Sequence, residues 1–413
     1  MKRVVITGLG AITPLGNDVK TTWDNMLQGR SGIDLIKSFD TSKHTVKIAG
    51  EVKDFQPETK LDPKAIKRLD RCVQLCLWAA LESVADAQID FEKYDKTDIG
   101  VILGSGIGGL LTWEEEHTKF MNQGPARVSP FLIPMMIPDM TSGYVAIHYG
   151  LKGPNYTTVS ACASGAHAIG TAFREIKLGN ASVVVTGGAE APVTPFALAG
   201  FSNMRALSRR NDEPQKASRP FDQARDGFVM AEGAAVLILE ELEFAKRRGA
   251  RIYAEIVGFG ATGDGYHITA PSPEGEGARR SMERAIKEAG CQKEQIDYIN
   301  THGTSTELND KFEAKAIKDL FGTHAAKIML NSTKSMIGHT LGAAGAIESV
   351  VTALSIYEQI LHPSINLENP DPECEGLNFV VNEARKTKID YALSNSLGFG
   401  GHNATICFKR YTE

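Results

Sequence analysis

Residues 156–178 read YTTVSACASGAHAIGTAFREIKL, a β-prone run that leads into a helix built largely from small residues. A helix with small side chains on every side can be buried centrally, with close neighbours. The same character returns at residues 338–359, GHTLGAAGAIESVVTALSIYEQ. Two such helices, one in each half of the chain, predict a duplicated α/β unit packed about a pseudo-twofold axis.

Short apolar runs alternate with helical patterns along the rest of the chain. We expect buried strands at residues 4–8, 99–103, 182–186, 234–239, 252–257, 296–300, 328–332 and 403–408. We expect helices at residues 64–87, 162–178, 275–289, 310–321 and 342–359. This alternation is typical of a layered α/β fold. The boundary is expected near Arg248–Arg251, so residues 1–250 and 251–413 should form two halves of one compact body.

The composition is that of a soluble globular protein, with 413 residues, 42% hydrophobic residues and 23% charged residues. A net charge of −5 gives no indication of nucleic-acid binding. Six scattered cysteines are too few for a disulfide framework and favour a reducing cytoplasm. The N-terminal apolar run is short and breaks at Gly8, which indicates a first strand and not a signal peptide. No stretch approaches the length of a membrane span.

Two tempting motifs do not predict a cofactor or a metal. Gly104–Gly109, GSGIGG, fits a dinucleotide-binding pattern, but a polar helical segment follows where a second strand would be needed. The glycines more simply permit a tight turn beside a cavity. Cys72 and Cys76 are one helical turn apart, with no further Cys or His pair nearby to complete a zinc site. We therefore expect neither a cofactor nor a bound metal.

Cys162 stands where the β-prone stretch turns into the first small-residue helix. A thiol at a helix start feels the positive end of the helix dipole, which favours the thiolate. The free N–H groups at the same place can bind an oxyanion. A small buried Cys with a packing role fits this segment equally well. The segment alone leaves both interpretations open.

Three further segments favour the reactive interpretation. His302 follows an expected strand in NTHGTSTELND, residues 300–310. Lys334 and His339 precede the second small-residue helix in NSTKSMIGHTLGAAG, residues 331–345. The segment NSLGFGGHN, residues 395–403, is a flexible turn that carries one aromatic residue. In parallel α/β sheets the ends of the strands hold the functional sites.

Together, ACASG, HGTST, KSMIGHTLGAAG and GFGGHN resemble the condensing enzymes of the thiolase-like fold. The chain looks like a 3-oxoacyl-[acyl-carrier-protein] synthase of the type II, elongating class. The resemblance covers the whole chain, from GLGAITPLG to the last of these motifs. It implies an α/β fold with a duplicated, five-layered α-β-α-β-α arrangement whose halves are related by a pseudo-twofold axis. It also implies a decarboxylative condensation of acyl and malonyl thioesters, with no cofactor.

The resemblance implies a role for each matching residue. Cys162 matches the acyl-accepting nucleophile, and His302 and His339 match the two histidines that stabilise the enolate. Lys334 is expected to disfavour their protonation, with Glu348 as the carboxylate beneath it. Phe399 matches a gating aromatic residue whose N–H joins that of Cys162 in the oxyanion hole. The residues expected to bind substrate are Thr304 and Thr306 at the phosphopantetheine arm, Ile107 and Phe201 at the acyl chain, and Gly400.

Some positions depart from the family pattern. Glu307 replaces a common proline, Ile337 a threonine and Thr340 a leucine, which puts in doubt the local loop shape and the chain-length preference. The resemblance also implies an acyl carrier protein as partner and a homodimer. Spacing places Lys64, Lys67, Arg68 and Arg71 on one helical face that could receive the acidic carrier. Arg127, Arg205, Arg209 and Arg210 are candidate additions to this surface.

Other functions within and beyond this enzyme class are less well supported. A thiolase would need a second cysteine at the C-terminal glycine-rich turn, where this chain has His402. A polyketide ketosynthase shares all the motifs and is only weakly excluded. A non-catalytic partner subunit that sets chain length would lack the nucleophile, and this chain retains Cys162.

Overall fold

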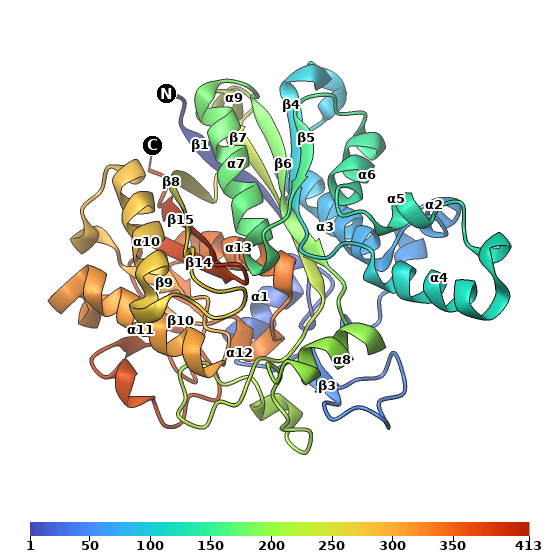
Figure 1. Cartoon of the computed structure of the whole chain (residues 1–413). Helices are drawn as coiled ribbons and strands as arrows, with labels where there is room; N and C mark the ends of the chain where they lie inside the picture. Colours follow the sequence, from blue (N-terminus) through green and yellow to red (C-terminus); the bar gives the residue numbers. More distant parts are fainter. Residues whose placement is uncertain (413) are drawn as a thin grey trace.

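The computed structural model describes residues 1–412, and its core is one mixed sheet of eleven strands (Figure 1). The order of the strands across the sheet is β12-β10-β9-β14-β15-β8-β1-β7-β6-β4-β5. These strands are β1 (Val4–Ile12), β4 (Ile99–Gly104), β5 (Asn155–Thr158), β6 (Val183–Glu190), β7 (Gly233–Glu241), β8 (Ala254–Gly263), β9 (Tyr298–Asn300), β10 (Met329–Asn331), β12 (Asn378–Phe379), β14 (Tyr391–Gly398) and β15 (His402–Lys409). Two small sheets pair β2 (Asp34–Leu35) with β3 (Ile48–Ala49), and β11 (Ile360–Leu361) with β13 (Arg385–Lys386).

Thirteen α-helices accompany the strands in the described chain. They are α1 (Val19–Leu27), α2 (Pro63–Ile66), α3 (Arg71–Ala87), α4 (Leu110–Gln123), α5 (Leu132–Met136), α6 (Met140–Tyr149), α7 (Ser164–Leu178), α8 (Pro195–Asn203), α9 (Leu242–Arg247), α10 (Glu276–Ala289), α11 (Glu307–Phe321), α12 (Lys334–Ile337) and α13 (Ala344–Glu358). None of those within residues 1–412 is both long and apolar enough to cross a membrane.

The order and direction of the strands repeat within the sheet. In the first half, β5-β4-β6 are parallel neighbours, and β7 and then β1 follow with antiparallel pairing. In the second half, β10-β9-β14 are parallel neighbours, and β15 and then β8 follow with antiparallel pairing. A short antiparallel pairing between β1 and β8, from Val4–Ile256 to Ile6–Ala254, joins the halves. The expected duplication is therefore present strand by strand.

Helices complete five layers around these two halves. The outer face of the first half is covered by α3 and α6, and that of the second half by α10 and α11. Between the halves lie the small-residue helices α7 and α13, which contact each other and the strands of both units (Figure 1). Small residues make this possible, because a side chain at Gly165 would meet the backbone of Ala346, and one at Gly345 would meet that of Ala166. These reciprocal contacts mark the pseudo-twofold axis.

Several elements, among them α1, α6 and α8, were not expected, and two further differences are instructive. The helix expected over residues 64–87 is two helices, because the Asp70 side chain accepts from the N–H of Cys72 and caps a new helix, α3. The strand β14 was not predicted, because its centre, Ser394–Ser396, is polar. These polar side chains are buried. Asn395 donates to Glu313 at 3.1 Å and accepts from Thr405 at 2.9 Å, so its tertiary partners compensate for its burial in the strand.

Candidate active site

Cys162 lies in a 3₁₀ turn, Ala161–Ala163, that leads directly into α7. Ala161 adopts a left-handed conformation with φ of 49°, which makes the sharp turn from β5 into the helix. The glycine-rich turn after β14 packs onto this place, and a side chain at Gly398 would lie 3.2 Å from the Cys162 nitrogen. Cys162 is 7% exposed and lines a cavity of about 450 Å³ that also reaches His302, His339 and Phe399.

The backbone N–H at the helix start acts in the expected direction and favours the thiolate, but burial has the larger effect. Burial raises the pKa of the Cys162 thiol to about 11. Lys334 and the backbone N–H groups of Phe399 and Cys162 act in the opposite direction, but the loss of solvation outweighs them. The thiol is therefore protonated at neutral pH. The two N–H groups nevertheless converge on the sulfur, which is the arrangement that an oxyanion hole requires.

His302 follows β9, and hydrogen bonds of its backbone groups fix its position. Its N–H donates to Glu313 at 2.8 Å, and its carbonyl oxygen accepts from Lys334 Nζ at 2.7 Å. Lys334 Nζ also lies 3.3 Å from His302 Nδ1 and contacts Glu348. Because an ammonium group only donates, Nδ1 must accept, and the ring proton is on Nε2. His302 thus presents an N–H donor to the cavity.

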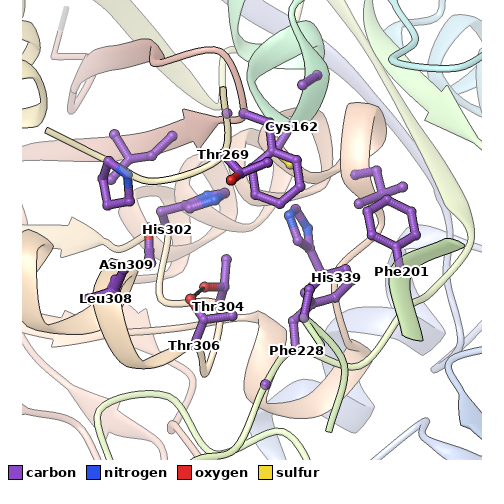
Figure 2. Close-up of a pocket in the computed structure, with 18 of the residues that line it drawn as sticks. Cys162, Phe201, Phe228, Thr269, His302, Thr304, Thr306, Leu308, Asn309 and His339 are labelled. Carbon is purple, nitrogen blue, oxygen red and sulfur yellow. Dashed lines mark hydrogen bonds between the residues drawn. The ribbon is translucent and has the colours of Figure 1, made fainter. Parts of the chain in front are cut away.

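His339 lies beside His302, with ring centroids 5.3 Å apart and planes at 84° (Figure 2). Its backbone N–H donates to Val229 at 2.7 Å, and its carbonyl oxygen accepts from Ala231 at 2.9 Å. Phe228 packs edge-on against the ring at 5.4 Å. The Nδ1 atom of His339 is buried and has no hydrogen-bond partner. The backbone therefore fixes the position of the ring, while Nδ1 has no partner within residues 1–412.

Both imidazoles are neutral at neutral pH. Burial lowers the pKa of His302 and of His339 well below the ordinary value of 6.5, and the charge of Lys334 lowers both further. The expected effect of Lys334 is confirmed, but burial is the larger cause. Burial also raises the pKa of Glu348 to about 7, although Lys334 opposes this. Two neutral N–H donors beside a thiol can stabilise a carbonyl that becomes an enolate.

Thr304 and Thr306 lie in the loop between His302 and α11, with their hydroxyl oxygens 2.9 Å apart, and both line the cavity. In Figure 2 this pair lies beyond the two imidazoles as seen from Cys162. Arg225 fixes this loop by donating to the carbonyl oxygens of Thr306 and Glu307 at 3.2 and 2.9 Å. Arg225 was not predicted, because nothing in its polar segment, DQARDGF, distinguishes it from a charge on the surface.

Ile107 and Phe201 line the apolar side of the cavity, as expected. The GSGIGG turn that carries Ile107 wraps around the carboxylate of Glu190, which accepts from the N–H groups of Gly106 and Ile107 at 2.7 and 3.1 Å. These N–H groups are thus occupied by a protein carboxylate. Glu190 also lines the cavity and was not predicted. A buried acidic residue at the end of an apolar strand is the signal that was overlooked.

The remaining predicted residues, Gly400 and the basic residues expected to bind the carrier protein, do not all lie at the cavity. Gly400 is exposed and does not line the cavity, and its N–H donates to the carbonyl oxygen of Ile268. Arg205 is exposed and lines the cavity, and Arg127 is exposed on the turn after α4. The expected basic helical face is wrong, because the break at Asp70 separates Arg71 from Lys64 and Lys67.

Arg71 is also engaged elsewhere, because its guanidinium group binds Glu232 at 2.6 Å.

Of the departures from the family pattern, Glu307 begins α11, and Ile337 and Thr340 are buried beside His339. Within residues 1–412, no three His, Cys, Asp or Glu side chains are grouped so as to hold a metal ion.

Comparisons with known proteins agree with this geometry. Residues 1–245 match the family described as beta-ketoacyl synthase, N-terminal domain, and residues 253–368 match its C-terminal domain. A 3-oxoacyl-[acyl-carrier-protein] synthase 2 from Staphylococcus aureus is 54% identical over 410 residues, 99% of each chain. One from Synechocystis is 52% identical over 410 residues, 99% of this chain and 98% of its own.

Solved structures are similar over the whole length. A beta-ketoacyl synthase from Burkholderia phymatum is 36% identical, with a TM-score of 0.93 and full coverage of both chains. A ketosynthase structure with a type II PKS acyl-carrier protein is 34% identical, with a TM-score of 0.92, and covers 99% of this chain and 100% of its own.

Proposed function

The chain belongs to the beta-ketoacyl synthase family, and we propose that its Cys162, His302 and His339 carry out the condensation. The enzyme is an acyltransferase of the 3-oxoacyl-[acyl-carrier-protein] synthase II type. It joins an acyl group to a malonyl unit with loss of CO2 in type II fatty acid synthesis. The 54% identity to fatty acid enzymes, against 34% to a polyketide ketosynthase, favours this over the polyketide alternative.

In the first half-reaction, the sulfur of Cys162 attacks the acyl thioester carbonyl. The N–H groups of Cys162 and Phe399 bind the oxyanion, and the carrier sulfur leaves. The Sγ proton must be removed during the attack, because burial raises the thiol pKa to about 11. His339 is the proposed base, because the lone pair of His302 on Nδ1 already accepts from Lys334. The proton ends on the departing carrier thiol. The product is a thioester of Cys162.

In the second half-reaction, a malonyl thioester occupies the vacated part of the cavity. Its thioester carbonyl accepts hydrogen bonds from His302 Nε2–H and from His339. The carboxylate leaves as CO2, and its bonding electrons form an enolate that these donors stabilise. The enolate carbon attacks the acyl carbonyl on Cys162. The C–S bond breaks, the 3-oxoacyl thioester departs on the carrier, and the Cys162 thiolate takes a proton from water.

An acyl carrier protein is the proposed partner for both half-reactions. The hydroxyls of Thr304 and Thr306 line the route to Cys162 and would bind the phosphopantetheine arm. Arg205 at the cavity, with the exposed Lys64, Lys67 and Arg68, would attract the acidic carrier. The complex of a related ketosynthase with its acyl-carrier protein supports this assignment.

We also propose that the enzyme is a homodimer. The strand β5 is an edge of the eleven-stranded sheet and pairs only with β4 within the described residues. Tyr156 and Val159 at this edge are 40% and 59% exposed. An unpaired edge with apolar side chains is a surface that proteins cover. Antiparallel pairing of two β5 strands about a twofold axis would cover it and continue the sheet into a second copy.

The observation that carries the proposed reaction is the pair of neutral, perpendicular imidazoles in one cavity with a buried thiol. The test is to incubate the enzyme with acyl carrier protein and measure the mass of the peptide that contains Cys162. We expect the acyl mass there, and no such mass and no 3-oxoacyl product with Cys162→Ala. Because both histidines remain in that variant, it should still decarboxylate malonyl carrier.

The matched control is Cys76→Ala, which removes a buried thiol on α3 outside the cavity lining and should leave both reactions unchanged. Formation of 3-oxoacyl product by Cys162→Ala would contradict the assignment of the nucleophile.

A further inference from the structure

The turn that carries Cys162 has a counterpart in the second half of the chain. The 3₁₀ turn Leu341–Ala343 precedes α13 as Ala161–Ala163 precedes α7. Leu341 has φ of 45°, close to the 49° of Ala161. Both following helices have fifteen residues and end at a left-handed cap. Gly342 therefore stands where the repeat would place a second Cys162.

The strands that end beside these turns are also related. β14 ends at Gly398, next to the backbone nitrogen of Cys162. β6, its counterpart, ends at Glu190, and the N–H of Gly342 donates to Glu190 Oε2 at 3.0 Å. The N–H of Gly342 thus stands at the place that corresponds to the N–H of Cys162, and it donates to a carboxyl group of the protein itself.

Glu190 uses both of its carboxylate oxygens. Oε2 accepts from Gly106 N at 2.7 Å as well as from Gly342, and Oε1 accepts from Ser105 Oγ at 3.0 Å and from Ile107 N at 3.1 Å. A side chain at Gly342 would come within 2.4 Å of Oε2, so a residue with Cβ would displace the carboxylate. One buried carboxylate thus clamps the GSGIGG turn of the first half to the second half.

We propose that Glu190 is a positioning residue that fixes Ile107 at the acyl end of the cavity and thereby sets which acyl chains reach Cys162. This inference rests on the proposed function, because it concerns the acyl chain of that reaction. The backbone of Ile107 is tied directly to Glu190, and its side chain lines the cavity with Phe201. A looser turn would let Ile107 move and would change the space available to the chain.

The charge of Glu190 gives a second, independent readout. Burial is the main cause of the raised pKa of the Cys162 thiol; of the charged groups, Lys334 lowers this pKa and Glu190 raises it to a smaller extent. His302 and His339 are neutral, and burial raises the pKa of Glu190 itself. Removing the charge of Glu190 while keeping its shape should therefore lower the thiol pKa. A purely structural role for Glu190 would not predict this direction.

The decisive variant is Glu190→Gln, compared with Glu232→Gln as control. Glutamine keeps the shape, but its amide group donates and cannot accept from the N–H groups that face one of the two oxygens. Glu232 is also buried, but it binds Arg71 and the N–H of Val52 and does not line the cavity. The two measurements are the rate of acyl-Cys162 formation from carriers of graded chain length, and the pH profile of Cys162 alkylation by iodoacetamide.

With Glu190→Gln, we expect the preference between long and short chains to change by about tenfold, the effect of losing a buried hydrogen-bonded clamp. The alkylation profile should move to lower pH. Glu232→Gln should change neither. Ser105→Ala removes one donor to Glu190 and should shift chain preference in the same direction by a smaller factor, which covers the case in which Glu190→Gln does not fold.

An unchanged chain preference and an unchanged alkylation profile in folded Glu190→Gln would overturn the inference. A wild-type enzyme that forms no acyl-Cys162 from any carrier would instead overturn the proposed function. The alkylation measurement would remain valid in that case, because it does not depend on acyl transfer.

Discussion

Lys334 is a buried cation whose ammonium group is fully engaged by the protein. Its Nζ contacts the His302 carbonyl oxygen, His302 Nδ1 and Glu348, and the side chain is 1% exposed. It therefore fixes the tautomer of one imidazole and keeps both imidazoles neutral. Glu348 compensates the charge, which a buried lysine requires. Positioning and electrostatics at the site thus depend on the same side chain.

Lys334→Met should shift the acid limb of malonyl decarboxylation to higher pH. The reaction requires neutral imidazoles, and in the wild type burial and Lys334 hold their pKa well below 6.5, so activity persists as the pH falls. Without the charge, both pKa values rise towards the ordinary value, and protonation inactivates the site at a higher pH. Loss of the His302 tautomer should also reduce the rate at neutral pH by about tenfold or more.

The measurement is CO2 release from malonyl carrier against pH. Lys177→Met is the control, because Lys177 pairs with Glu288 at the far end of α7. An acid limb that stays in place in Lys334→Met would contradict the electrostatic role.

At the scale of elements, the break between α2 and α3 separates residues expected to bind the carrier protein, Lys67 and Arg68, from Arg71, which stabilises the fold. Lys67→Glu with Arg68→Glu should raise KM for carrier-bound thioesters about tenfold and spare small thioesters, because both side chains are exposed and would face an acidic partner. Arg71→Ala should lower stability instead, because it leaves the buried Glu232 without its cation. Steady-state kinetics of the Lys67→Glu, Arg68→Glu variant with both substrate types, with Lys287→Glu on α10 as control, would test the docking prediction. Equal effects on both substrate types would exclude docking.

The elements also show how far the sequence could predict the fold and the site. The two small-residue helices could be assigned to the central layer from sequence, because small side chains on every side allow neighbours to pack closely around a helix. The start of α3 was missed although Asp70 is a good capping residue, since the apolar spacing runs through it. β14 could not be found from a local pattern, because its centre is polar and Asn395 is held there by the distant Glu313. Glu190 had a local signal, because it is an acidic residue at the end of an apolar strand. Cys162, His302 and His339 line one cavity, but the burial that shifts their pKa values could not be read from the motifs.

At the scale of the whole molecule, the duplication produces two similar turns: one carries Cys162, and the N–H of Gly342 in the other donates to Glu190. Within residues 1–412, the edge strand β5, which precedes Cys162, has no partner on its outer side. A dimer built on this edge would hold the segment that leads to the nucleophile. The oligomeric state and the activity should therefore be linked.

Tyr156→Asp with Val159→Asp should convert the dimer to a monomer and reduce condensation, because two charges in place of apolar side chains would oppose pairing of the β5 edges. Sedimentation velocity at several concentrations gives the oligomeric state, and acylation of Cys162 gives the activity. Leu178→Asp is the control, since Leu178 is 69% exposed at the far end of α7. A wild-type protein that sediments as a monomer would contradict the proposed dimer. A double variant that stays dimeric would place the interface elsewhere. A monomeric variant with normal acylation would instead show that the turn before Cys162 is rigid without its partner.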